Sequence, residues 1–376
     1  MQSGLPPRSG EGGDGGAHRA NSSTPQAGGP VLTSRTLRTA YGIGSWLVTV
    51  AITLVGLAAL TFFIGRVIPI DPALKIVGDK ATHEAYQKVF LELGLDQPLY
   101  VQFWRYIAGI LRGDFGISFQ TTRPVLQDLL TFFPATLELS TIGLVLGVVL
   151  GIPMGVASAY WHEKWPDHLI RVVSLIGYSV PVFWLALVGL FVFYYKLGWV
   201  AGPGQLDVFY NGVVTRVTGF ILVDSLLGGQ TDVFWNAVGH MTLPAILLGY
   251  YSLAYISRMT RSVMLDELSR EYILAARLKG ASELRVVANH ALRNAAIPLV
   301  TIIALSYGGL LEGSVLVETI FSWPGIGNYI YQSLFAADMN AVLGGTLLVG
   351  AVYVLINTLS DVLYRTLDPR SRGQRT

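Results

Sequence analysis

The sequence contains no cysteine and few charged residues. Of its 376 residues, 13% are Asp, Glu, Lys or Arg, whereas 52% are hydrophobic. The absence of cysteine excludes disulfides and thiolate chemistry, and it is compatible with either side of a membrane. The net charge is only +2 and the basic residues are spread along the chain. This distribution argues against nucleic acid as a partner.

Signatures of nucleotide, metal and acyl-transfer chemistry are also missing. Each of the six lysines follows a residue other than glycine, so the Gly-Lys-Ser/Thr core of a phosphate-binding loop is absent. The His-Glu pairs at 83–84 and 162–163 lack the second histidine of a zinc-binding helix. No Gly-x-Ser-x-Gly elbow occurs. We therefore predict a chain that is not an enzyme, does not hydrolyse ATP and holds neither metal nor cofactor.

Long uncharged apolar runs dominate the remainder of the chain. Six of them cover residues 44–65, 139–160, 172–195, 241–257, 294–311 and 339–360. Each is long enough to cross roughly 30 Å of hydrocarbon, with the fourth and fifth near the lower limit. Six such helices in a soluble protein would leave too little polar surface to cover them. The sequence predicts an all-α polytopic membrane protein with six transmembrane helices.

The placement of Lys and Arg predicts the orientation of these spans. With the amino terminus in the cytoplasm, 17 of the 26 basic residues lie inside and nine lie outside. Seven of the nine fall in the long segment between the first two spans, and long translocated segments count less in this rule. Both termini and the charged segment 258–294 are therefore expected on the cytoplasmic side.

The runs also divide the chain into segments. Residues 1–43 are expected to form a disordered cytoplasmic tail rich in Gly, Ser and Pro, followed by an uncleaved first span at 44–65. A periplasmic segment (66–132), a five-helix core (133–363) and a short cytoplasmic tail (364–376) complete the chain. Within the periplasmic segment, the apolar and aromatic stripe after Pro98 predicts an interfacial helix. This helix and the outer segment 198–240 either receive a partner protein or pack on the membrane domain.

Small residues recur on two of the predicted spans. The second span has glycine at every fourth position, and the fifth has a glycine pair; these residues are Gly143, Gly147, Gly151, Gly155, Gly308 and Gly309. Such a face permits close helix packing in lipid, and Pro153 adds an expected kink. The pattern predicts either helix packing or the lining of a translocation path.

Few ionisable residues lie near the spans. They are Glu138, Glu312, Glu318 and Asp361, and a charge at the bilayer centre costs about 2.5–3.5 kcal/mol on insertion scales. Because they form no chain of acids, they argue against a proton- or sodium-driven carrier. We predict that Glu318 is a structural hydrogen-bonding group beside the Pro324-Gly325 turn, with a substrate contact as the alternative.

The charged segment EYILAARLKGASELRVVANHALRNAAIP, residues 271–298, separates two spans. Helix-forming residues at 265–279 predict a short helix with a face of small residues. Gly280 suits the left-handed end of that helix, and Ser282 is expected to cap a second one. Pro298 marks the entry to the next apolar run. The segment thus predicts a helix, a glycine turn and another helix.

Two alanines followed after three residues by glycine, and later by Ile-Pro at 297–298, resemble the EAA loop of ATP-binding-cassette (ABC) importer permeases. The chain is similar, more narrowly, to the first permease of dipeptide, oligopeptide and nickel importers. The matching stretches are GLDQPLYVQFWRYI (94–107), GDFGIS (113–118), FPATLELS (133–140), SVPVFWLAL (179–187), HMTLPAILLG (240–249) and ETIFSWPGIG (318–327). PIDP at 69–72 departs from this family, which has glycine in place of Ile70.

The resemblance implies a type I ABC importer permease fold in a bacterial inner membrane and a coupling helix that docks in a cleft of an ATPase subunit. The residues that it assigns to this loop are Glu271, Tyr272, Ala275, Ala276, Arg277, Lys279, Gly280, Arg293, Asn294 and Pro298. Gly280 and Ala276 are expected to serve fit and turn geometry, whereas Glu271, Arg277 and Lys279 are expected to contact the ATPase.

The same resemblance implies a set of partners. They are a second homologous permease, two ABC ATPases that bind ATP and Mg, and a periplasmic or lipid-anchored substrate-binding protein. A homodimer is the alternative to the permease heterodimer. Peptides are the expected cargo, with nickel chelates, opines or oligosaccharides as alternatives. Outside this family, a secondary carrier or an intramembrane hydrolase is the remaining alternative.

Overall fold

The computed structural model describes residues 31–67, 72–78 and 80–367. Two compact units are distinguished, Met1–Thr49 and Val50–Thr376, and the described part of the first is the beginning of helix α1 (Val31–Val67). Residues 31–43 were expected in a disordered tail, but they are helical. The reason is local composition, because the glycine-rich stretch ends before residue 31 and no glycine occurs at 31–41. The rest of the two predicted tails, 1–30 and 368–376, lies outside the described residues.

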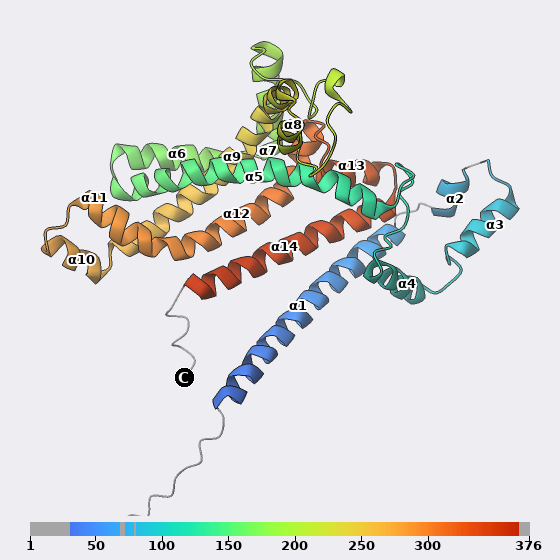
Figure 1. Cartoon of the computed structure of the whole chain (residues 1–376), viewed down its shortest axis with the longest axis horizontal. Coiled ribbons are helices and arrows are strands. Elements are labelled where there is room, and N and C mark those ends of the chain that lie inside the picture. Colours follow the sequence, from blue (N-terminus) through green and yellow to red (C-terminus); the bar gives the residue numbers. More distant parts are fainter. Residues whose placement is uncertain (1–30, 68–71, 79, 368–376) are drawn as a thin grey trace, which may run out of the picture. The chain divides into compact units, whose positions relative to one another are not determined.

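Helices account for the regular structure of the described part of the second unit (Figure 1). After α1 come α2 (Pro72–Val77), α3 (His83–Glu92), α4 (Leu99–Leu111), α5 (Val125–Tyr160), α6 (Trp165–Ser179), α7 (Val182–Gly189), α8 (Ile221–Leu227), α9 (Thr231–Leu268), α10 (Glu271–Leu278), α11 (Glu283–Arg285), α12 (Leu292–Ile320), α13 (Ile326–Phe335) and α14 (Met339–Leu367). Two π-helical stretches, η1 (Leu190–Lys196) and η3 (Val286–Ala291), continue α7 and α11, and η2 (Val208–Tyr210) is a 3₁₀ turn. The predicted all-α class is confirmed.

The predicted number of six spans is not reproduced. Among the described residues, four helical stretches are long and apolar enough to cross a membrane, at Gly44–Gly65, Val125–Tyr160, Glu283–Ile320 and Met339–Ser360. The predicted fourth span, 241–257, lies within α9 and is not among them. The residues Tyr250, Tyr251 and Ser252 lower the mean hydropathy of this run, and Arg258 follows directly after it.

The predicted third span, 172–195, is broken and not continuous. Helices α6 and α7 meet at an angle of 97°, and they form a fifth span only if this bent pair counts as one. The break lies at Val180, which is extended with ψ 126°. Because the ring of Pro181 disfavours the helical conformation in the residue before it, α6 must end there.

The four glycines of α5 form one buried face, which packs against α9. A Cβ on Gly143 would lie 2.9 Å from the Cβ of Leu248, and a Cβ on Gly155 would lie 2.6 Å from the backbone oxygen of Ser257. Both distances are shorter than van der Waals contact. The glycines therefore allow the two backbones to approach closely, which stabilises helices in lipid through dispersion.

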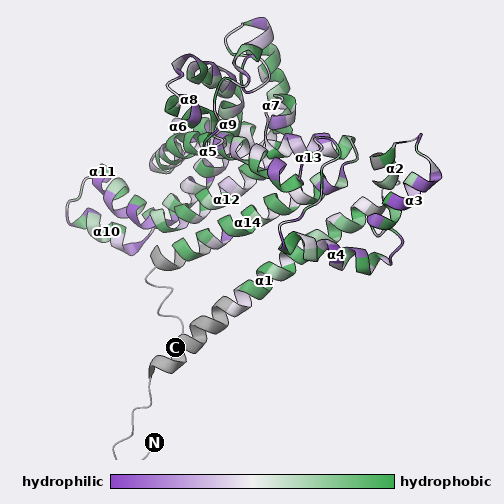
Figure 2. Cartoon of the chain, turned by 45° about the vertical axis from the view of Figure 1, so that its right-hand side comes forward, coloured by the Kyte–Doolittle hydropathy of each residue, from purple (hydrophilic) through white to green (hydrophobic). Residues whose placement is uncertain are grey.

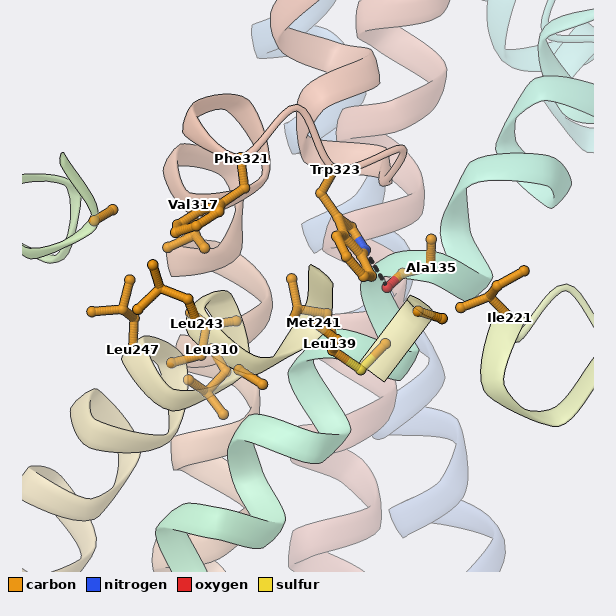
Figure 3. Packing of buried hydrophobic residues seen from close by; sticks show 14 residues of the cluster. Ala135, Leu139, Ile221, Met241, Leu243, Leu247, Leu310, Val317, Phe321 and Trp323 are labelled. Carbon is orange, nitrogen blue, oxygen red and sulfur yellow. Dashed lines mark hydrogen bonds between the residues drawn. The ribbon is translucent and has the colours of Figure 1, made fainter. Parts of the chain in front are cut away.

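A hydrophobic core joins α5, α9 and α12 and extends to the loop after α12 (Figure 3). Phe321 and Trp323 on that loop are buried, with 2% and 0% of their surface exposed. The indole N–H of Trp323 donates a hydrogen bond of 3.1 Å to the carbonyl oxygen of Ala135. A buried indole N–H would otherwise be unpaired, so this bond fixes the loop on α5.

Candidate functional site

The charged segment between α9 and α12 begins with an interruption of the helix that we did not predict from the sequence. The first helix was expected over 265–279, but α9 continues through Leu268 and α10 starts only at Glu271. Between them, Arg270 is extended with ψ 149°. The hydroxyl of Ser269 donates to the carbonyl oxygen of Asp266 at 2.7 Å. This hydroxyl satisfies a carbonyl at the end of α9 and allows the chain to turn.

Gly280 ends α10 in the left-handed conformation expected from the sequence, with φ +83°. The N–H of Gly280 donates to the carbonyl oxygen of Arg277 at 2.9 Å, and the N–H of Ala281 donates to that of Ala276 at 3.2 Å. These two bonds make a Schellman motif. A Cβ at Gly280 would meet no atom within 4 Å. Glycine is therefore required here by the backbone conformation and not by lack of space.

An ion pair spans the glycine turn. Arg277 Nε and Nη2 donate to the two carboxylate oxygens of Glu283 at 2.9 and 3.1 Å, although both side chains are about half exposed. An exposed pair of this kind contributes about 0–1 kcal/mol, so it restricts the angle between α10 and α11 more than it stabilises the fold. Ser282 occupies the N-cap position of α11 as predicted, but its side chain makes no capping hydrogen bond.

Ile273 anchors α10 to the rest of the chain, and sequence analysis missed it. It is 0% exposed and packs in a cluster that joins the ends of α5 and α9 to η3 and α12. The buried members are Ala159, Met264, Ile273, Val286, Val287, Ala291, Ala295 and Leu299. Of the small residues on α10, Ala276 is half-buried whereas Ala275 is exposed. The buried contact of α10 is therefore formed by Ile273, a larger residue than the alanines of the predicted small-residue face.

The opposite side of the loop exposes large apolar side chains. Leu274, Leu278 and Leu284 have 59%, 81% and 79% of their surface exposed, and we call these three residues the docking face. Glu271 and Lys279 are exposed beside them. Figure 2 shows hydrophilic residues on α10 and α11, whereas α14 is mostly hydrophobic. An apolar face with a charged rim is the usual composition of a protein interface.

The remaining predicted loop residues lie apart from the docking face. Tyr272 donates its hydroxyl to Glu267 Oε2 at 2.6 Å, which ties α10 to the end of α9. Arg293 and Asn294 are exposed on α12, and the amide of Asn294 donates to the carbonyl oxygen of His290 at 3.1 Å. Pro298, predicted at the entry to the next apolar run, lies inside α12, and the chain is already helical from Glu283 onward.

The predicted glycines of the fifth span differ from each other. A Cβ on Gly308 would lie 2.9 Å from the ring of Tyr353 on α14, whereas one on Gly309 would meet no atom within 4 Å. Gly308 therefore allows α12 and α14 to approach closely. Pro153 lies inside α5, which continues through it as one helix.

A buried ion pair between α6 and α9 was not predicted either. Asp167 at the start of α6 is 0% exposed and accepts bonds from Arg261 Nε and Nη2 at 2.7 and 2.8 Å. Its carboxylate also accepts from the hydroxyl of Ser158 at 2.5 Å and from the N–H of Glu163 at 3.0 Å. All four bonds to one carboxylate fix α9 to the α5–α6 turn. The two partners are 94 residues apart in the sequence, so no local pattern predicts their pairing.

Two carboxylates near the predicted spans each accept hydrogen bonds from the beginning of a short helix. Glu318 is 0% exposed and accepts from the N–H groups of Gly327 and Asn328 in the first turn of α13, at 2.8 and 3.1 Å. Glu138 accepts from the N–H groups of Ile221 and Leu222 in α8, at 3.0 and 2.9 Å. The prediction of a hydrogen-bonding role for Glu318 beside the turn at 324–325 is confirmed. The same role of Glu138 was missed.

Two family models match the chain. The model described as "Binding-protein-dependent transport system inner membrane component" matches residues 147–373, and the model for the N-terminal part of such membrane components matches residues 44–140. The chain therefore belongs to the family of inner-membrane components of binding-protein-dependent transport systems. It is a multi-pass permease component of the inner membrane.

Curated relatives match over almost the full length of their chains. The probable D,D-dipeptide transport system permease protein DdpB of Escherichia coli strain K12 is 44% identical over 315 residues, which is 84% of this chain and 92% of that protein. The di/tripeptide transport system permease protein DppB of Pseudomonas aeruginosa is 43% identical, over 86% of this chain and 96% of that protein. Among solved structures, the MetNI methionine ABC transporter matches with 18% identity and a TM-score of 0.46, over 62% of this chain and 93% of that one.

Proposed function

We propose that this chain is the transmembrane permease subunit of an ATP-driven, binding-protein-dependent importer of peptides. The observation that carries the proposal is the identity of 43–44% to relatives named for di- and tripeptide transport. A further relative, the dipeptide permease DppB of Escherichia coli strain K12, is 41% identical over 86% of this chain. Nothing comparable favours nickel chelates, opines or oligosaccharides as the cargo.

The docking loop, which we define as α10, the turn at Gly280 and α11, links the ATPase subunits to the spans in this proposal. Two ATPase subunits bind ATP and Mg, close on each other and move the docking face. Ile273 carries that motion inward, because it packs with Ala159 of α5, Met264 of α9 and Leu299 of α12 in one cluster. A close-packed cluster transmits displacement instead of absorbing it. The spans then alternate between inward-facing and outward-facing arrangements.

The remaining partners follow from the same proposal. Both termini and the docking loop lie in the cytoplasm, and a second homologous permease completes the translocation path. At the opposite ends of the spans, α4 and the segment 198–240 receive the substrate-loaded binding protein. His240 ties the start of this segment to α9, since its Nδ1 lies 2.9 Å from the carbonyl oxygen of Gly202 and its Nε2 lies 3.2 Å from Asp207 Oδ1.

Uptake of a labelled dipeptide by proteoliposomes tests the proposed function. The complete transporter is reconstituted with ATP inside the vesicles and with the binding protein outside. We expect uptake that requires both ATP and the binding protein. Unlabelled di- and tripeptides should inhibit this uptake. Uptake without ATPase subunits would assign the chain to the secondary carriers. ATP-dependent uptake of a nickel chelate or a sugar, unaffected by peptides, would reject the cargo but keep the transporter class.

A further inference from the structure

A pocket whose mostly apolar lining carries several polar and charged side chains, called here the polar pocket, lies between α1, α4 and the beginning of α14. It has a volume of about 240 Å³. Its lining includes Gln102, Arg105, Tyr106 and Asp114, and Gly65 of α1 and Met339 of α14 also contribute. The span on α1 ends at Gly65 and the span on α14 begins at Met339. The pocket is therefore located at a boundary between hydrocarbon and the polar region.

Two buried polar atoms of this pocket have no hydrogen-bond partner within the described ranges. They are Oε1 of Gln102 and the hydroxyl oxygen of Tyr106. Gln102 is only 9% exposed, and its Nε2 already donates to the carbonyl oxygen of Gln97 at 2.8 Å. The free group of this amide is therefore an acceptor. Unpaired buried polar atoms are rare in native proteins and need a ligand, an ion or water as partner.

The pocket also carries charges of both signs. Arg105 takes part in none of the ion pairs found in the described part of the chain. Asp114 lines the same pocket and accepts the N–H of Gly116 at 2.9 Å through Oδ1. The residues that line the pocket thus include a guanidinium, a carboxylate and two neutral groups with unused hydrogen-bonding capacity.

An apolar groove adjoins the polar pocket. It has a volume of about 310 Å³ and is lined by side chains such as Val55, Ile110, Leu130 and Leu347, from α1, α4, α5 and α14. Phe115 lines both the groove and the polar pocket. The groove faces the apolar part of the spans, where a hydrocarbon chain is the natural occupant.

The polar pocket and the apolar groove lie one after the other along α1 and along α14. On α1, Phe62 lines the polar pocket and Ala58 the groove; on α14, Leu343 lines the pocket and Leu347 the groove. Four residues along a helix correspond to about 6 Å. The polar pocket lies nearer the span ends and the groove lies deeper, which is the polarity gradient of a phospholipid.

We propose that the pocket and the groove together bind one phospholipid. The headgroup phosphate pairs with Arg105, and an acyl chain fills the groove. Gln102 Oε1 and Asp114 accept hydrogen bonds from the headgroup, which must therefore carry N–H donors, as an ethanolamine ammonium does. Tyr100 and Trp104 on α4 are 67% and 61% exposed, and such aromatic residues favour the headgroup level of a bilayer.

Photolabelling of the reconstituted complete transporter tests this proposal. The probe is phosphatidylethanolamine with a diazirine near the middle of one acyl chain, and the labelled peptides are mapped by mass spectrometry. We expect label on the peptides that contain Val55, Ile110 and Leu130. Unlabelled phosphatidylethanolamine competes, whereas phosphatidylcholine, which lacks N–H donors, competes weakly.

Arg105→Gln removes the phosphate partner and is expected to reduce this label about tenfold, which corresponds to 1.4 kcal/mol. Arg112→Gln is the matched control, since Arg112 is also exposed and lies at the end of the same helix, but it does not line the pocket. Tyr106→Phe keeps the ring, which stacks on Phe62 with centroids 5.8 Å apart, and removes only the unpaired hydroxyl. We expect it to weaken labelling without affecting folding.

Three results would overturn the proposal. They are labelling spread evenly over the lipid-facing spans, equal labelling of Arg105→Gln and Arg112→Gln, and cross-links that place the second permease in the groove. The uptake of peptides is not the readout, so failure of the lipid site would leave the proposed transport function intact.

Discussion

Glu318 of α12 and Thr136 of α5 are joined by a hydrogen bond of 2.7 Å in a site closed to solvent. The hydroxyl of Thr136 donates to Glu318 Oε1 and accepts from the N–H of Ile326 at 2.8 Å. The hydroxyl of Ser314 donates to the same carboxylate oxygen at 3.1 Å. One carboxylate therefore connects two spans with the first turn of α13, where negative charge is favoured by the helix dipole.

Glu318→Gln should destabilise the chain although it is nearly isosteric. The amide nitrogen of glutamine cannot accept, so one of the N–H donors of Gly327 and Asn328, or a hydroxyl, loses its partner. Leaving a buried donor unpaired costs about 1–3 kcal/mol. A lower thermal unfolding midpoint in detergent is expected. Glu312→Gln is the control, because Glu312 is exposed on the same helix; equal midpoints for the two variants would contradict this role.

Arg261→Gln should be more damaging than loss of the pair as a whole. The single variant leaves the carboxylate of Asp167 buried without its cation, and breaking a buried pair in this way costs about 3–5 kcal/mol. The double variant Asp167→Asn, Arg261→Gln removes both charges and is expected to recover part of the lost stability. A double-mutant cycle on unfolding midpoints measures this coupling. Additive losses would show that the two side chains do not stabilise each other.

Asp224 makes the outer segment sensitive to acid. Its carboxylate accepts from the N–H groups of Val217, Thr218 and Gly219 at 3.1, 2.8 and 2.9 Å, and from the Thr218 hydroxyl at 2.7 Å. Burial alone would raise the pKa of Asp224, but these hydrogen bonds to the charged form outweigh it and lower the pKa.

The lowered pKa fixes the sign of the expected effect. The stabilisation is present above the ordinary carboxyl pKa of about 3.9 and is lost as the pH falls through the folded value. Wild type should resist proteolysis of the segment 198–230 better than Asp224→Asn at pH 7, and the difference should vanish in acid. A difference that persists or grows as the pH falls would contradict the role of the charged carboxylate.

The docking face should be needed for assembly and dispensable for folding. Leu278→Ser and Leu284→Ser each remove an apolar side chain, whose burial at an interface contributes about 1.5–3 kcal/mol. We expect recovery of the ATPase subunits with the tagged permease to fall about tenfold or more at an unchanged unfolding midpoint. Val208→Ser, 84% exposed on η2, is the control. Undiminished recovery of the ATPase would place the interface elsewhere.

The sequence predicted those features that depend on local chemistry. Gly280 is an example, because a helix that ends before a glycine leaves few alternatives for the backbone. The glycine face of α5 is another, since its period of four matches one side of a helix. Features that depend on distant partners were missed. The sequence near Ile273 does not indicate the hydrophobic cluster in which it packs. Likewise, the sequence near Asp167 does not indicate its partner Arg261.

The errors in the spans have a related cause. Hydropathy locates apolar runs but carries no information on their direction, so the bend at Val180–Pro181 was not predicted although Pro181 was visible. The run 241–257 of α9 was expected to span because it is uncharged, but its tyrosines and serines make it less apolar than the four stretches that are long and apolar enough to cross a membrane. The packing of α9 on the glycine face of α5 explains how a moderately polar helix is accommodated in the fold.

We propose that α10, Gly280 and α11 couple ATP hydrolysis to transport, and ATP-driven dipeptide uptake by Gly280→Val and Gly280→Asn tests this coupling most directly. Valine resists the left-handed conformation, whereas asparagine tolerates it. In proteoliposomes with equal amounts of inserted transporter, we predict that Gly280→Val abolishes uptake and that Gly280→Asn retains most of it. Wild-type uptake by correctly inserted Gly280→Val would contradict the account.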